Sequence, residues 1–195
     1  MAGELFDKKS DFFKTYFDKA LSYEDFVKTG TAVQTEKWTN FAGKISLDEA
    51  QKTMLSGFTR SMNILVLSGV WCGDCARQCP MLDLMAQSSK VMNLKFIDNQ
   101  TYPELRDELR VCGGSRVPMA LILSEDFFEV SRFGDRQLSV YRKKALNELG
   151  AACDPGILPP PANELAEEVR EWLAFVERAQ LMLRLSPFLR NRYKD

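Results

Sequence analysis

Apolar residues recur over the first forty positions at spacings of three and four, with lysines and aspartates between them. This period is typical of amphipathic helices, so we expect helical structure over residues 3–42, broken near Gly30. The aromatic positions in this stretch favour packing against the rest of the molecule over a groove for a partner. Ser46 and Glu49 have the spacing of a capping box and predict a further helix that runs to about Phe58.

The middle of the chain has a different pattern, in which helical periods alternate with short apolar runs. The run at 63–70 is apolar at nearly every position, as in a strand buried between helices. The expected elements are a strand at 63–70, a helix at 72–89 that contains Pro80, a parallel strand at 94–98, a helix at 103–109, a hairpin of strands at 119–123 and 129–133, and a helix at 138–149.

A proline-rich linker is expected at 153–161, stiff and extended. Beyond it, apolar positions trace one face of a long amphipathic helix, with Asn163 as its cap and Ser186-Pro187 at its end or at a kink. The pattern favours a helix that folds back onto the domain, although a free amphipathic helix can also recruit a partner or lie on a membrane. The predicted segments are an N-terminal extension (1–44), a central domain (45–152), the linker (153–161) and a C-terminal helix (162–195).

Two cysteines, Cys72 and Cys75, follow the apolar run at 63–70 directly. At the start of a helix, cysteines three positions apart can interconvert between dithiol and disulfide. The unpaired N–H groups and the positive end of the helix dipole stabilise a thiolate on the first of them. Cys72 is therefore the expected attacking sulfur and Cys75 the resolving one. Zinc sites use the same spacing, so the motif alone leaves both chemistries open.

Composition narrows the class of protein. A chain of 195 residues with 45% apolar content can bury one core and an appended element. A net charge of −1 gives no electrostatic reason to expect nucleic-acid or membrane binding. No apolar run approaches the length of a membrane span, and the N-terminus lacks the layout of a signal peptide. We therefore expect a cytoplasmic protein, in which cysteines tend to be catalytic, redox-sensing or metal-binding.

The absence of histidine excludes Ser-His-Asp and Cys-His catalysis and any zinc site with a histidine ligand. Three cysteines remain besides the pair. Cys79 lies one helical turn after Cys75 and is a candidate second resolving thiol or metal ligand, although a small buried residue is the favoured interpretation. Cys112, six residues before Pro118, is a candidate to approach the redox pair, although burial as a small hydrophobe is the favoured interpretation. Cys153 is expected to have no role in the chemistry.

From roughly Ile45 to Gly150 the chain resembles the thioredoxins. The stretch Trp71-Cys72-Gly73-Asp74-Cys75 is similar to their Trp-Cys-Gly-Pro-Cys redox motif, and Pro80 falls where they carry a proline in the active-site helix. Arg116-Val117-Pro118 and the following apolar strand resemble their cis-proline loop. Gly134 falls where they have a glycine at the border of the substrate groove. The aspartate within the motif and the added helical N-terminal region suggest a bacterial-type branch.

The resemblance implies an α/β thioredoxin fold, a central mixed sheet flanked by helices, with helical extensions at both ends. It implies a thiol-disulfide oxidoreductase that reduces protein disulfides through Cys72 and Cys75 and needs no cofactor beyond this redox-active pair. The expected partners are disulfide-bearing protein substrates and a reductase or other dithiol electron donor, without nucleic acid, membrane or metal. The expected substrate-binding residues are Trp71, Gly73, Asp74, Val117, Pro118 and Gly134.

Some features leave the chemistry open. Asp74 replaces a proline of the motif, and its carboxylate disfavours a neighbouring thiolate, whereas Arg116 is a candidate source of positive charge. Val66 stands where thioredoxins keep a buried aspartate that accepts the proton of the resolving cysteine. The alternative function is therefore a binding module that recognises a protein through Trp71 and Pro118 without turnover. A thiolate metal site ranks last, because the local sequence provides no fourth ligand.

Overall fold

The computed structural model describes residues 6–149 and 163–194. It begins with three helices, α1 (Ser10–Lys19), α2 (Tyr23–Lys28) and α3 (Ala32–Ala42). Thr31 starts α3 through a capping box, in which its hydroxyl accepts the N–H of Gln34 while the Gln34 side chain accepts the N–H of Thr31. The helical character predicted for this region, and its break near Gly30, are therefore confirmed.

Helix α4 (Glu49–Ser56) begins later than predicted. Its capping box is formed by Asp48 and Gln51 rather than by Ser46 and Glu49. The Asp48 carboxylate accepts the Gln51 N–H at 2.8 Å, and the Gln51 side chain accepts the Asp48 N–H at 2.9 Å. Leu47 is buried immediately before this cap, so the chain turns into the helix only after its side chain has entered the core.

The sheet contains four strands, β1 (Met62–Ser68), β2 (Met92–Asp98), β3 (Met119–Leu123) and β4 (Glu129–Gly134). Their order across the sheet is β2-β1-β3-β4. Strands β1 and β2 are parallel, whereas β1 with β3 and β3 with β4 are antiparallel. All residues of the central strand β1 are buried, as its continuous apolar run predicts. This mixed sheet with flanking and added helices confirms the α/β, thioredoxin-like fold class.

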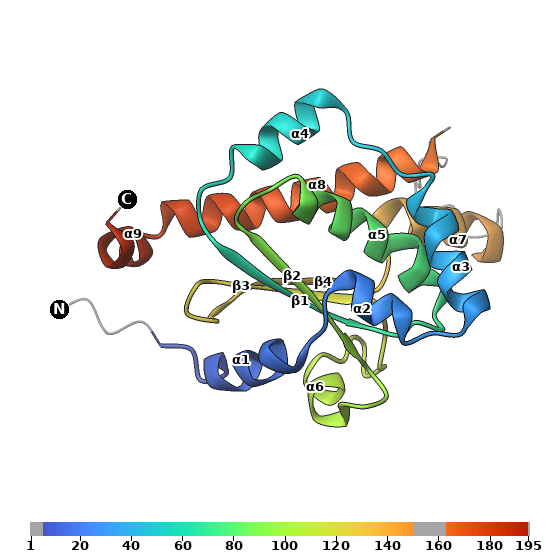
Figure 1. The fold of residues 1–195 in the computed structure, drawn as a ribbon, viewed down its shortest axis with the longest axis horizontal. Coiled ribbons are helices and arrows are strands. Elements are labelled where there is room, and N and C mark those ends of the chain that lie inside the picture. The colour runs from blue at the N-terminus through green and yellow to red at the C-terminus, as the bar shows by residue number, and fades with distance from the viewer. Residues whose placement is uncertain (1–5, 150–162, 195) are drawn as a thin grey trace.

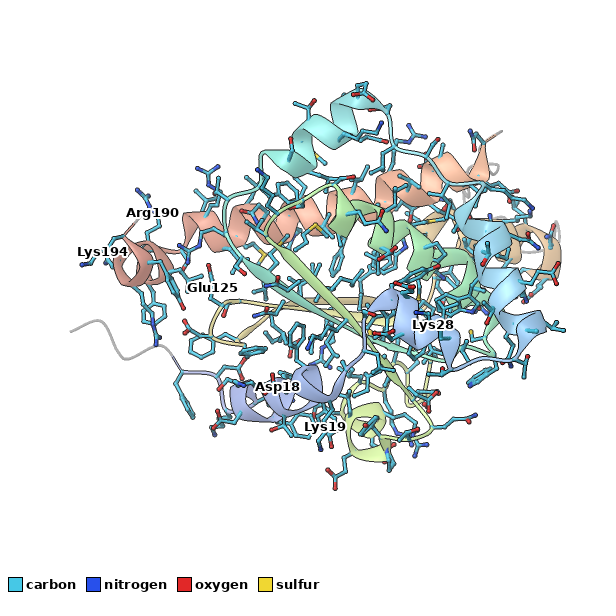
Figure 2. All side chains as sticks on the ribbon, viewed as in Figure 1. Asp18, Lys19, Lys28, Glu125, Arg190 and Lys194 are labelled. Atoms are coloured by element: carbon cyan, nitrogen blue, oxygen red, sulfur yellow. The ribbon has the colours of Figure 1, made fainter. Side chains whose placement is uncertain are left out.

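The remaining helices are α5 (Gly73–Gln87), α6 (Pro103–Glu108), α7 (Leu138–Leu149), α8 (Glu164–Leu185) and α9 (Pro187–Tyr193). Helices α5 and α8 lie on one side of the sheet, and α1 and α6 lie on the other (Figure 1). Side chains fill the space between the helices and the sheet (Figure 2). Within the described residues, no helix has both the length and the apolar character needed to cross a bilayer.

The C-terminal helix α8 folds back onto the domain, as its apolar face predicts. Trp172 is fully buried, and its ring lies 4.9 Å from that of Phe133 on β4. The expected cap is also present, since the Asn163 side chain accepts the N–H of Ala166. The predicted linker, 153–161, lies outside the described residues, so the division into four segments stays a prediction.

Candidate active site

Cys72 and Cys75 lie where β1 passes into α5. Cys72 is the N-cap residue of α5, and its Sγ accepts the backbone N–H of Cys75 at 3.5 Å. Both side chains are free thiols, with Cys72 partly exposed and Cys75 fully buried. Gly69 lies in the turn between β1 and α5. Only glycine fits at this position, because a Cβ there would lie 2.6 Å from the Trp71 ring. The turn therefore leaves one sulfur accessible at the start of a helix and holds the other behind it.

The two thiols influence each other's ionisation. The hydrogen bond with Cys75 and burial raise the pKa of Cys72, while the backbone N–H groups of Cys75 and Asp74 act in the opposite direction. Burial raises the pKa of Cys75 well above its usual range. In such a pair the first proton leaves more easily than the second, because the remaining thiol donates a hydrogen bond to the thiolate. Exposure makes Cys72 the sulfur that can meet another molecule.

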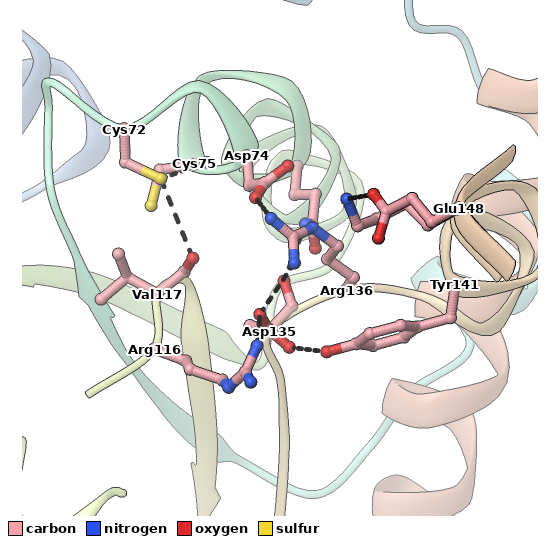
Figure 3. A network of polar contacts seen from close by, with 11 residues as sticks. Cys72, Asp74, Cys75, Arg116, Val117, Asp135, Arg136, Tyr141 and Glu148 are labelled. Carbon is pink, nitrogen blue, oxygen red and sulfur yellow. Dashed lines mark hydrogen bonds and ion pairs between the residues drawn. The ribbon is translucent and has the colours of Figure 1, made fainter. Parts of the chain in front are cut away.

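The proline loop lies opposite the exposed sulfur. The peptide bond between Val117 and Pro118 is cis, and the Val117 carbonyl oxygen lies 3.8 Å from the Cys72 Sγ (Figure 3). At the end of β4, a Cβ on Gly134 would lie 2.4 Å from the Pro118 carbonyl oxygen, so a glycine is needed for this close approach. The Trp71 side chain beside the motif is 47% exposed. The structure thus brings the predicted loop and motif residues together around one sulfur.

A network of charged groups links the redox motif to the segment after β4 (Figure 3). Arg136 donates to the Asp74 carboxylate at 2.5 Å and to the Asp135 carboxylate at 3.3 Å. Asp135 also accepts hydrogen bonds from Arg116, at 3.1 Å, and from the Tyr141 hydroxyl. Although burial of Asp135 acts in the opposite direction, hydrogen bonds from Tyr141 and Arg116 lower its pKa. The positive charge of Arg116 is therefore largely neutralised by the buried carboxylate of Asp135.

The comparisons agree with this geometry. A family model described as thioredoxin matches residues 20–143. The chain belongs to the thioredoxin family. The match begins within the range predicted as the N-terminal extension, so the family domain includes helices α2 and α3 as well as the sheet and α5.

Two solved structures resemble this thioredoxin-family chain. A protein of unknown function from Pseudomonas aeruginosa has a TM-score of 0.65 and 25% sequence identity, over 84% of this chain and 95% of its own. An HIV epitope scaffold has a TM-score of 0.58 and 22% identity, over 86% of this chain and 92% of its own, and supports the fold alone. A comparison with the curated proteins finds no match.

Cys79 and Val66 both lie in the buried core of this thioredoxin-family structure. Cys79 is fully buried, as the favoured interpretation predicts, and its Sγ lies 3.6 Å from the hydroxyl of Ser68. Val66 is also fully buried, between Phe96 and Ala120 of the neighbouring strands. Among the described residues, no group of three or more histidine, cysteine, aspartate or glutamate side chains could hold a metal ion.

The prediction for Cys112 is wrong, because its side chain is exposed. The residue has a φ of 49° in a tight turn, where Val111 and Gly114 form an isolated bridge, and this turn directs the side chain outward. Cys153 lies outside the described residues.

Sequence reasoning missed two cations at the motif. Arg136 is 62 residues from Asp74 along the chain. Lys37 on α3 also reaches the motif, since its Nζ lies 3.2 Å from the position that a Cβ on Gly73 would occupy. Neither has a local sequence signal, because each reaches the motif from a separate element through the tertiary fold.

Proposed function

We propose that this protein is a thiol-disulfide oxidoreductase that reduces protein disulfides through Cys72 and Cys75. One observation carries the proposal: a partly exposed sulfur caps a helix, with a buried second thiol behind it and the Val117-Pro118 loop at 3.8 Å. A cytoplasmic location and a place in a bacterial-type branch of the family belong to the same proposal.

The reaction begins with attack of the Cys72 thiolate on one sulfur of a substrate disulfide. This forms a mixed disulfide and releases the other substrate sulfur as a thiolate, which takes up a proton. Cys75 then loses its proton and attacks the Cys72 sulfur, releasing the second substrate thiol. Two electrons have passed to the substrate, and a Cys72–Cys75 disulfide remains. An external dithiol, or a reductase that supplies electrons to it, restores the reduced pair.

Substrate binding follows from the surroundings of Cys72. The backbone of Val117 beside Pro118 can pair with an extended polypeptide, so that main-chain hydrogen bonds place the substrate disulfide against the sulfur. Trp71 offers exposed apolar surface next to the nucleophile, and Gly73, Asp74 and Gly134 complete the proposed binding surface. Recognition through the backbone is compatible with many protein substrates.

The alternative function is a binding module that holds a partner at Trp71 and Pro118 without turnover. The buried side chain of Val66 favours it, because valine stands where thioredoxins keep an aspartate and cannot accept the proton of Cys75. If the protein is instead an oxidoreductase, the proton of Cys75 needs another acceptor. Water that enters the site when the mixed disulfide forms fills this role.

Reduction of a model protein disulfide in the presence of dithiothreitol tests the proposal. We expect activity in the wild type and in the matched control Cys112→Ser, which changes an exposed cysteine outside the Cys72–Cys75 motif. Cys72→Ser should abolish activity, and Cys75→Ser should accumulate mixed disulfides that mass spectrometry can identify. Activity that survives in Cys72→Ser refutes the nucleophile, and an inactive wild type that still binds partners supports the binding module.

A further inference from the structure

Helix α3 is fixed to the turn that leads into the redox motif. Trp38 on this helix is fully buried, and its indole N–H donates to the carbonyl oxygen of Val70 at 2.8 Å. Val70 lies two positions before Cys72. Because the indole is held by both packing and a hydrogen bond, the neighbouring residues of α3 have a defined position relative to the cysteine.

Lys37, next to Trp38, extends to the tip of α5. Its Nζ lies 3.2 Å from the point that a Cβ on Gly73 would occupy, and Gly73 directly follows Cys72. Because glycine has no side chain, the Lys37 ammonium group can lie in the space next to Gly73. Lys37 is exposed, and it makes no hydrogen bond or ion pair with any residue in the described ranges 6–149 and 163–194.

Two other charged residues near the motif, Asp74 and Arg116, are paired. Asp74 on α5 binds Arg136 at 2.5 Å, and Arg116 on the proline loop binds Asp135 at 3.1 Å. These pairs largely cancel within themselves, whereas the charge of Lys37 remains. A cation beside a cysteine favours its thiolate, and here it adds to the effect of the helix N-terminus.

We propose that Lys37 is a positioning residue of the redox site, which increases the reactive form of Cys72 by placing an unpaired positive charge beside Gly73. This inference rests on the proposed function only for its biological use, because the effect on the Cys72 sulfur exists without any substrate. It assigns to the N-terminal helices a part in the chemistry in addition to their packing.

The test measures the pH dependence of Cys72 alkylation by iodoacetamide in the reduced full-length protein, with the alkylated peptide identified by mass spectrometry. Removing one exposed charge beside the tip of α5 should raise the pKa of Cys72 by about 0.5 in Lys37→Gln, which is about a threefold slower reaction at pH 7. Reversing the charge in Lys37→Glu should about double the shift. High salt should reduce both shifts, because the lysine is exposed.

Lys44→Gln is the matched control, because it removes an exposed lysine just beyond the end of the same helix. Its Cys72 profile should match the wild type, and urea unfolding should show that all three variants are folded. An unchanged Cys72 profile in Lys37→Gln and Lys37→Glu, or an equal shift in Lys44→Gln, overturns the inference. If disulfide reduction fails while the alkylation shift appears, the proposed function is wrong and the assignment of Lys37 stands.

Discussion

The pair formed by Asp74 and Arg136 allows a quantitative prediction about the redox site. Their side chains are 31% and 23% exposed, and the guanidinium donates to the carboxylate at 2.5 Å. Substitution of Arg136 by glutamine removes the cation that is hydrogen-bonded to this carboxylate, two positions after Cys72. For an assumed separation of roughly 7 Å and an effective dielectric constant between about 20 and 80, a carboxylate disfavours the thiolate by about 0.6–2.4 kcal/mol. We therefore expect the pKa of Cys72 to rise by roughly one unit in Arg136→Gln.

A double-mutant cycle isolates this effect from other consequences of the substitution. Asp74→Asn removes the negative charge nearest to Cys72 along the helix and leaves Arg136 bound to Asp135, so the pKa of Cys72 should fall. Asp74→Asn/Arg136→Gln should return close to the wild-type value, because both charges are absent. The assay is the pH dependence of Cys72 alkylation, with Arg184→Gln as a control, since this exposed arginine lies at the end of α8 away from the motif (Figure 1).

The reasoning is refuted if Arg136→Gln shifts the Cys72 profile equally in the presence and absence of the Asp74 carboxylate. That result would mean that the arginine acts on the sulfur directly or through the shape of the loop after β4. No shift in any variant would show that solvent screens the motif completely, as it does for many exposed ion pairs.

Two further predictions concern stability. Gly134→Ala places a Cβ 2.4 Å from the Pro118 carbonyl oxygen, so urea unfolding should show that the free energy of unfolding falls by about 2–3 kcal/mol, and disulfide reduction should also fall. The control is Gly43→Ala, which should be nearly neutral because the nearest atom to its Cβ lies at 3.6 Å. Equal costs would contradict the close approach. Burial raises the pKa of Asp83 to about 6, so its charge destabilises the folded state above pH 6 and this cost fades as pH falls towards the unfolded value. Asp83→Asn should therefore stabilise the protein by about 1–2 kcal/mol at pH 7.5 and by little at pH 4, and a gain independent of pH would show another cause.

The elements that sequence predicted well are those with strong local patterns. The apolar run that becomes β1 is buried at every position, and the two cysteines follow it at the start of α5. The strands β3 and β4 pair as the predicted antiparallel hairpin. In each case the signal comes from residues adjacent in the chain, where burial on both faces or a short connection permits few alternatives.

The start of α4 shows where local patterns are ambiguous. Ser46 with Glu49 and Asp48 with Gln51 have the same spacing, and either pair can cap a helix. The burial of Leu47 decides between them, and burial depends on the tertiary fold. Cys112 was mispredicted for a related reason, since a turn with positive φ directs a side chain that composition alone would place in the core.

The added helices explain why the electrostatics of the site could not be predicted from the motif alone. A buried glutamate on α8, Glu168, pairs with Arg77 on α5 at 2.5 Å, so the C-terminal helix is fixed to the helix that carries the cysteines. On the opposite flank, α3 is fixed to the entry of the motif through Trp38. Both attachments join residues far apart in sequence, so the motif alone does not predict them. In the proposed mechanism the motif specifies which sulfur attacks, whereas the side chains that reach the motif from other elements influence its ionisation.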